Sequence, residues 1–251
     1  MILAIDAGNS RTKWGVFDAG GKLIAQGALD NSELQSLAQP LPAWRDCQSV
    51  VISNVAGPAL GEKIGALLLP LAIPMRTITA QPASCGVTNT YVNPEQLGSD
   101  RWAALIAAWN QYRQPCIVAT AGTALTVDAL SGSGEFLGGM ILPGIGLMQQ
   151  SLLDSTAGIR ESMGEWQDFP TSTANALYTA ALTAAAGNVK GMAARLQRHS
   201  RAEPLVVVGG GDAKLLAECL LERIVMTNKL VIADNLVLQG LLLIENELGT
   251  P

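Results

Sequence analysis

The sequence has little of what metal and nucleic-acid sites usually need. It contains one histidine, His199, and four cysteines that lie far apart and form no CxxC pair, which argues against a Cys/His zinc cluster. Its 16 Lys and Arg residues are outnumbered by 21 Asp and Glu residues, giving a formal net charge of -5. Without a basic surplus to neutralise phosphates, the chain is not expected to bind nucleic acid.

Long apolar runs are also missing. No stretch reaches the roughly 18 uninterrupted apolar residues needed to span a bilayer, and no basic segment precedes the first apolar run, as it would in a signal peptide. We therefore expect a cytoplasmic protein that does not bind a membrane. Hydrophobic residues still make up 49% of the 251 residues, which is enough for one large core or two smaller ones.

Short apolar runs alternate with glycine turns and with longer helical segments. The expected strands are residues 2–5, 13–17, 22–29, 49–54, 116–120, 125–130, 135–142, 205–208 and 230–233. The expected helices are residues 60–71, 99–113, 173–197 and 213–222, with a further helix closing the chain. Strands mixed with helices throughout indicate an α/β fold.

The two halves of the chain repeat one layout. Residues 5–12 match residues 119–126, and each segment runs strand, small-residue turn, strand, glycine turn, strand. The repeat is weak in sequence but clear in the order of its parts. It predicts two similar α/β lobes, residues 1–113 and residues 114–251.

A candidate phosphate loop follows the first strand. Its residues are Asp6, Ala7, Gly8, Asn9 and Ser10. Glycine lets backbone N–H groups approach phosphate oxygens, and the carboxylate can hold Mg²⁺. Because the Walker A pattern and a strand-to-helix GxGxxG are both absent, a nucleotide site here is of another type. An ordinary tight turn, with Asp and Asn as turn formers, explains the same residues equally well.

Other glycine turns strengthen the nucleotide interpretation. The equivalent loop of the second half is Thr120, Ala121, Gly122, Thr123 and Ala124. Two such loops could grip a polyphosphate from both sides, and the turn at residues 209–212 could approach an adenine or a ribose. Residues 138–144 place further glycines around an apolar strand. Strand-to-helix turn chemistry remains nearly as good an explanation for the turn at 209–212 when it is judged alone.

An acid and a base stand together where a helix is expected to begin. Asp100 and Arg101 follow Gly98 and Ser99, and Tyr91 lies a few residues earlier. Asp100 could accept a proton from a substrate hydroxyl, and Arg101 could clamp a carboxylate. A helix cap with a weak surface ion pair is the simpler interpretation of these residues alone.

Taken together, these segments resemble the type III pantothenate kinases, also described as the Bvg accessory factor family. The order and separation of the motifs fit from one end of the chain to the other, and residues 98–101 are the most specific part. The resemblance implies an actin-like fold of two RNase H-like lobes, with mixed sheets and a cleft between them, usually as a homodimer. It also implies transfer of the ATP γ-phosphate to pantothenate, the first step toward coenzyme A.

The resemblance further implies roles for individual residues. ATP phosphates and Mg²⁺ would be bound by Asp6, Ala7, Gly8, Asn9, Ser10, Arg11, Thr12 and Lys13, and ATP also by Thr123. Pantothenate would be bound by Tyr91, Gly98, Ser99, Asp100, Arg101 and Thr173, with Asp100 as the catalytic base. The family's potassium or ammonium ion is held partly by an aspartate, but Thr120 stands at that position here. It offers oxygen without charge, which puts the monovalent cation in doubt.

Two alternatives remain open from the sequence. Another actin-like small-molecule phosphotransferase would share the glycine loops, although it would not explain residues 98–101. A non-catalytic transcriptional accessory protein would have little reason to keep Asp6, Asp100 and Thr123 together.

Overall fold

The computed structural model describes residues 1–38, 44–156, 164–224 and 226–249. The chain forms two compact units. Unit 1 comprises Met1–Gln111 and Asn235–Pro251, and unit 2 comprises Tyr112–Asp234. In the described ranges, no helix has both the length and the apolar character required to cross a membrane.

Unit 1 is built on a mixed sheet with the strand order β3-β2-β1-β4-β5. Strands β1 (Ile2–Ala7), β2 (Arg11–Phe17) and β3 (Leu23–Asp30) are joined as antiparallel neighbours. Strand β4 (Ser49–Asn54) pairs parallel with β1, and β5 (Met75–Thr77) pairs parallel with β4. The short apolar runs predicted as strands therefore form the centre of this sheet, where both faces are covered.

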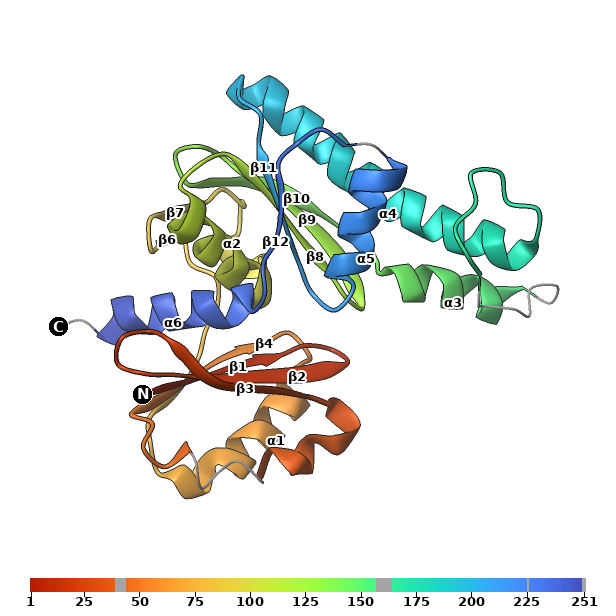
Figure 1. Cartoon of the computed structure of the whole chain (residues 1–251). Coiled ribbons are helices and arrows are strands. Elements are labelled where there is room, and N and C mark those ends of the chain that lie inside the picture. Colours follow the sequence, from red (N-terminus) through yellow and green to blue (C-terminus); the bar gives the residue numbers. More distant parts are fainter. Residues whose placement is uncertain (39–43, 157–163, 225, 250–251) are drawn as a thin grey trace. The chain divides into compact units, whose positions relative to one another are not determined.

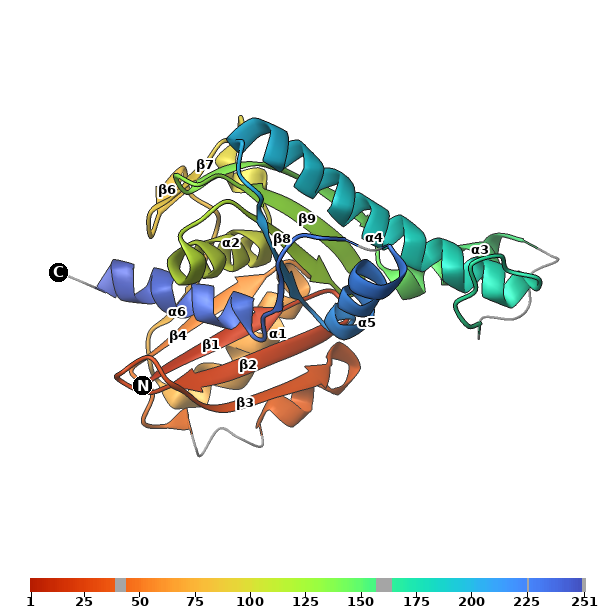
Figure 2. The ribbon, with the colours of Figure 1, turned by 45° about the horizontal axis from the view of Figure 1, so that its top comes forward.

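Helices lie on both faces of the unit 1 sheet (Figures 1 and 2). Helix α1 (Pro58–Leu68) contributes Ile64 and Leu68 to a core that also contains Leu3 and Ile5 of β1. Helix α6 (Leu236–Gly249) covers the opposite face. The smaller elements of this unit are the 3₁₀ segments at Asn31–Ala38, Leu69–Leu71 and Pro94–Gln96 and the antiparallel hairpin of β6 (Ala83–Ser84) and β7 (Val87–Asn89).

The closing helix belongs to unit 1, although the sequence placed it in the lobe at residues 114–251. It packs closely on α2 (Ser99–Tyr112) at Gly240. A Cβ atom at Gly240 would stand 1.9 Å from the carbonyl oxygen of Ala103, so only glycine permits this approach. The chain thus returns to its first unit at its end, which a linear division of the sequence does not anticipate.

Unit 2 repeats the topology of unit 1. Within it the strands run in the order β12-β11-β8-β9-β10. Strands β8 (Cys116–Ala121), β9 (Ala124–Leu130) and β10 (Glu135–Pro143) are antiparallel neighbours. Strand β11 (Leu205–Gly209) pairs parallel with β8, and β12 (Leu230–Ile232) pairs parallel with β11. Strand for strand, this matches the sheet of unit 1, in agreement with the internal repeat.

Three helices complete unit 2: α3 (Ile145–Ser155), α4 (Thr173–Ser200) and α5 (Ala213–Glu218). The alanine-rich α4 packs closely on the sheet, since Ala181 and Ala185 share a core with Ile117 and Ala119. The sequence did not predict α3. It predicted one helix over residues 213–222, whereas α5 ends at Glu218 and a π-helix continues over Cys219–Arg223.

Candidate active site

The β1–β2 hairpin forms the predicted phosphate loop. Asp6 and Lys13 face each other across the two strands, and the N–H of Gly8 donates to the carbonyl of Arg11 at 3.0 Å to close the turn. Arg11 is exposed and lies 3.2 Å from Asp30, an ion pair of little energetic weight. The loop therefore combines an acid, a base and a tight glycine turn at one end of unit 1.

Asp6 is the most perturbed carboxyl group of this loop. Burial and the nearby charge of Asp100 raise its pKa from 3.8 to about 7, against the opposing effect of Lys13. Its Oδ1 atom is buried and has no hydrogen-bond partner among the described residues. An orphaned carboxylate oxygen beside a phosphate loop fits a hard cation such as Mg²⁺, because such ions prefer oxygen ligands.

A pair of serine hydroxyls brings Asp100 close to Asp6. Ser53 faces Asp6 across the β1–β4 pairing, and its hydroxyl shares a buried 2.9 Å hydrogen bond with that of Ser99. Asp100 follows Ser99 in the first turn of α2. A Cβ atom at Gly98 would lie 2.6 Å from Asp100 Oδ1, so glycine makes room for the carboxylate.

The pKa of the Asp100 carboxyl group reflects opposing influences. Burial raises its pKa, although the Arg101 N–H, which donates to Oδ1 at 2.7 Å, and the Arg101 charge both lower it. A carboxylate with a raised pKa is a stronger base, which suits proton transfer near neutral pH.

Arg101, the residue after Asp100, contacts Tyr91. Arg101 is only 6% exposed, so the alternative of a surface ion pair does not describe it. Its Nη1 donates to the Tyr91 hydroxyl at 3.3 Å, and its guanidinium carbon lies 5.9 Å from the centre of the tyrosine ring. Unit 1 thus brings together every residue predicted for the phosphate loop and most of those predicted for the acceptor.

The glycine turns of unit 2 also gather in one place. The N–H of Gly144 donates to the Thr123 carbonyl at 2.9 Å, and the N–H of Asp212 donates to the Ala121 carbonyl at 3.1 Å. Gly210 has a φ of 99°, and a Cβ atom there would lie 2.1 Å from the Ala121 carbonyl oxygen. Glycine is therefore required for these three turns to meet around Thr123.

Thr120 and Thr173 complete the predicted site residues in unit 2. Thr120 faces Thr126 across the β8–β9 pairing, and Thr126 Oγ1 is buried without a partner in the described part of the chain. These two hydroxyls offer oxygen atoms but no negative charge. Thr173 is exposed at the start of α4, directly after the N-cap Ser172. No group of three His, Cys, Asp or Glu residues among the described residues could hold a metal ion.

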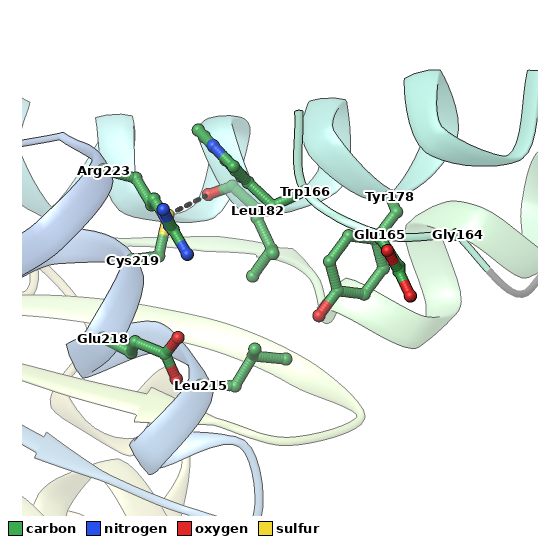
Figure 3. A pocket seen from close by; sticks show the side chains of 9 residues that line it. All are labelled: Gly164, Glu165, Trp166, Tyr178, Leu182, Leu215, Glu218, Cys219 and Arg223. Atoms are coloured by element: carbon green, nitrogen blue, oxygen red, sulfur yellow. Dashed lines mark hydrogen bonds between the residues drawn. The ribbon is translucent and has the colours of Figure 1, made fainter. Parts of the chain in front are cut away.

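A cavity of about 330 Å³ lies elsewhere in unit 2 (Figure 3). Tyr178 and Leu182 of α4 line one side, and Leu215 of α5 and Cys219 of the π-helix lie opposite them. The Cys219 thiol contacts the Leu182 carbonyl at 3.8 Å. None of the predicted site residues lines this cavity.

Sequence reasoning missed two residues that support the site. Ser53 was read only as part of a buried strand, and Asn31 was not singled out. Ser53 shares a hydrogen bond with Ser99. Asn31 hydrogen-bonds Thr12 and the backbone carbonyls of the predicted phosphate loop. The only signal in the sequence was that each lies at or just after the end of a strand. Many polar residues share that position, so the signal does not single out these two.

Comparison with known proteins identifies the family. A family model of the type III pantothenate kinases matches residues 2–195. The chain belongs to the type III pantothenate kinase family. A type III pantothenate kinase from Nitrosospira multiformis is 44% identical over 247 residues, which cover 98% of this chain and 92% of the relative. One from Methylobacillus flagellatus is 41% identical and covers 98% of both chains. The resemblance seen in the sequence is confirmed.

Solved structures support the fold of this pantothenate kinase family member. A conserved putative Baf family transcriptional activator from Campylobacter jejuni aligns with a TM-score of 0.61 at 22% identity, over 98% of both chains. A putative 2-dehydro-3-deoxygalactonokinase from Sinorhizobium meliloti aligns with a TM-score of 0.63 at 14% identity, over 100% of both chains. At these identities the likeness concerns the fold alone. The predicted actin-like α/β fold with mixed sheets is confirmed.

Proposed function

We propose that this chain is an ATP-dependent kinase that transfers the γ-phosphate of ATP to the hydroxyl group of pantothenate. The observation that carries the proposal is the pairing of two half-buried carboxyl groups, Asp6 in the phosphate loop and Asp100 at the start of α2. Each has a raised pKa, and the charge of Asp100 acts on Asp6. Perturbed acids that interact in this way are typical of active sites.

Asp6 and the loop that follows it would receive the phosphates of ATP. Mg²⁺ bound with ATP supplies positive charge that offsets the charge on the phosphoryl oxygens. Asp6 would hold that ion through Oδ1, which has no hydrogen-bond partner among the described residues. Lys13, opposite Asp6 in the hairpin, adds a positive charge on the same side. The loop from Ala7 to Thr12 would present backbone groups to the phosphates, and Thr123 is assigned to ATP by the family resemblance alone.

Asp100 would take the proton of the pantothenate hydroxyl as its oxygen attacks the γ-phosphorus. The new bond forms between that oxygen and phosphorus, the bond to the β-phosphate oxygen breaks, and ADP leaves. Arg101 binds the substrate carboxylate, with Tyr91 fixing the guanidinium. Gly98, Ser99 and Thr173 are assigned to pantothenate by the family resemblance alone.

Several further assignments are predictions of the resemblance. They are a homodimer, a cytoplasmic location, a role in coenzyme A biosynthesis, and the absence of nucleic-acid and membrane partners. The resemblance implies that a potassium or ammonium ion is held by an aspartate at the position of Thr120. In this chain the position carries the uncharged Thr120, paired across the strands with Thr126. We expect weak or no dependence on such an ion. Light scattering coupled to size-exclusion chromatography tests the dimer.

A coupled assay of ADP release, with and without pantothenate, tests the proposed activity. We expect turnover only when both substrates are present.

Asp100→Asn should lose most of kcat while keeping its affinity for ATP, because the amide cannot accept the proton. Asp46→Asn, the same change at an exposed carboxylate of unit 1, is the matched control and should retain full turnover. Absence of turnover in the unmodified chain would favour a non-catalytic accessory protein, and near-normal turnover in Asp100→Asn would remove Asp100 from the role of base.

A further inference from the structure

Asn31, which follows β3, makes four hydrogen bonds to the first phosphate loop and its flank. Its side-chain amide donates to the carbonyls of Gly8 at 2.8 Å and Asn9 at 3.0 Å. Its backbone N–H donates to the carbonyl of Ser10 at 3.0 Å. Its Oδ1 accepts from the hydroxyl of Thr12 at 2.8 Å. One residue therefore engages three successive carbonyl groups of the loop.

These contacts fix the direction of the loop's N–H groups. In a planar trans peptide the C=O and the following N–H point in opposite directions. Because the Gly8 and Asn9 carbonyls point at Asn31, the N–H groups of Asn9 and Ser10 point away from it. Successive N–H groups turned to one side form the kind of concave site that binds phosphate oxygens.

The Gly8 and Asn9 carbonyls, which can only accept, require the NH₂ end of the Asn31 amide to face the loop, and Thr12 supports this orientation. Its side chain is fully buried, and its hydroxyl donates to Oδ1. With Oδ1 occupied in this way, the NH₂ end of the amide is turned to the two carbonyls. Thr12 was predicted to bind ATP, and its buried side chain can contribute to that binding through Asn31.

We propose that Asn31 is a positioning residue of the nucleotide site, which holds residues 8–10 in the orientation that presents the N–H groups of Asn9 and Ser10 to the phosphates of ATP. The proposal rests on the proposed function of the loop. Asn31 would then set nucleotide affinity without touching the nucleotide. A simpler role is possible for a residue at the start of a 3₁₀ segment, namely to stabilise unit 1 as a whole, and the experiment must separate the two.

Asn110 provides the matched control. It lies near the other end of α2, is half-buried like Asn31, and also donates from its side-chain amide to two backbone carbonyls, those of Cys85 and Ile106, each at 3.0 Å. Asn31→Ala and Asn110→Ala therefore delete comparable hydrogen bonds in the same unit. If Asn31 acts only through stability, the two variants should behave alike.

The experiment measures the Kd of Mg-ATP by calorimetry, the KM values of ATP and pantothenate, and the thermal midpoint for each variant. Asn31→Ala should weaken ATP binding at least fivefold, because the Gly8 and Asn9 carbonyls lose the donor that holds them, and should leave the pantothenate KM within twofold. Asn110→Ala should lower the midpoint similarly and leave both KM values unchanged. A change in ATP affinity below fivefold for Asn31→Ala, or equal changes in both variants, would overturn the proposal.

Thr12→Val alone provides a second measurement for the case in which Asn31→Ala folds poorly, and a double-mutant cycle tests whether the two residues act together. Valine keeps the shape of the buried threonine and removes its hydroxyl. Thr12→Val alone should weaken ATP binding in the same direction, and it should have no further effect when combined with Asn31→Ala. Additive effects, or unchanged affinity in Thr12→Val, would contradict action through Asn31. Because ATP binding is measured without pantothenate, failure of the proposed kinase activity would leave this result interpretable.

Discussion

Asp6→Asn should stabilise the chain in the absence of nucleotide and Mg²⁺, and more strongly at high pH. Folding raises the pKa of Asp6 from 3.8 to about 7. Between these two values the folded state retains a proton that the unfolded chain has released, so stability falls as pH rises through this range and stays low above it. Asparagine carries no ionisable group and avoids the penalty.

The magnitude follows from the pKa values. They differ by about 3, and each pKa unit corresponds to about 1.4 kcal/mol. At pH 8 the penalty is therefore about 4 kcal/mol, and at pH 5 it is about 2 kcal/mol, because only the difference between pH 5 and 3.8 counts. Asp6→Asn should recover these amounts in the free energy of unfolding.

Urea unfolding at pH 5 and pH 8, followed by tryptophan fluorescence, measures the effect. The signal reports mainly on unit 1, which contains Trp14, Trp44, Trp102 and Trp109 of the five tryptophans. Asp46→Asn is the control and should change little at either pH. Equal stabilisation at both pH values, or a loss of stability at pH 8, would refute the electrostatic account of Asp6. The same variant should lose Mg-ATP binding, so stability and function should change in opposite directions.

The remaining predictions concern the acceptor, the monovalent cation and the packing of α6. Arg101→Ala should raise the KM for pantothenate at least tenfold through loss of a charged hydrogen bond, and an unchanged KM would place the carboxylate elsewhere. Turnover in sodium, potassium and ammonium buffers should agree within about twofold, because Thr120 carries no charge to hold an ion; strong activation by one ion would contradict this. Gly240→Ala should cost at least about 2 kcal/mol of unfolding free energy, since its Cβ would meet the Ala103 carbonyl. Gly146→Ala, a helical glycine with open space around it, should instead be neutral or stabilising in the same unfolding measurement.

Much of the fold could be predicted because its central strands are short apolar runs bounded by glycine. The bounds of β4 matched the prediction, and the order of elements predicted a duplication that the two sheets repeat strand for strand. Helix α3 was missed because Pro143, Gly144 and Gly146 suggest a turn where it begins, although Ile145, Met148 and Leu152 follow helical spacing. The three strands β5, β6 and β7 are two or three residues long, too short to show any periodicity.

The site was less predictable than the fold, because its residues meet through tertiary contacts. Asp6 and Lys13 could be paired from the hairpin alone. The effect of Asp100 on Asp6 could not be predicted, since it depends on the tertiary packing that also brings Ser53 of β4 against Ser99 of α2. From the sequence alone, a helix cap was the simpler interpretation of Asp100, and its raised pKa depends on burial that the sequence does not reveal.

The strand pairings also show how the two turns of the internal repeat differ in chemistry. The sequence match aligned Thr12 with Thr126, but the strand pairings show otherwise: Asp6 faces Lys13 in unit 1, and Thr120 faces Thr126 at the corresponding place in unit 2. The turn between β8 and β9 is one residue shorter, which accounts for the offset. A charged pair in one unit thus corresponds to a neutral pair in the other. The pairings therefore place charged residues at this position in unit 1 and uncharged hydroxyl groups in unit 2. Replacing Thr120 with aspartate would test this asymmetry directly: potassium or ammonium should then accelerate turnover relative to sodium, whereas equal rates would show that charge at this position does not create an activating site in this chain.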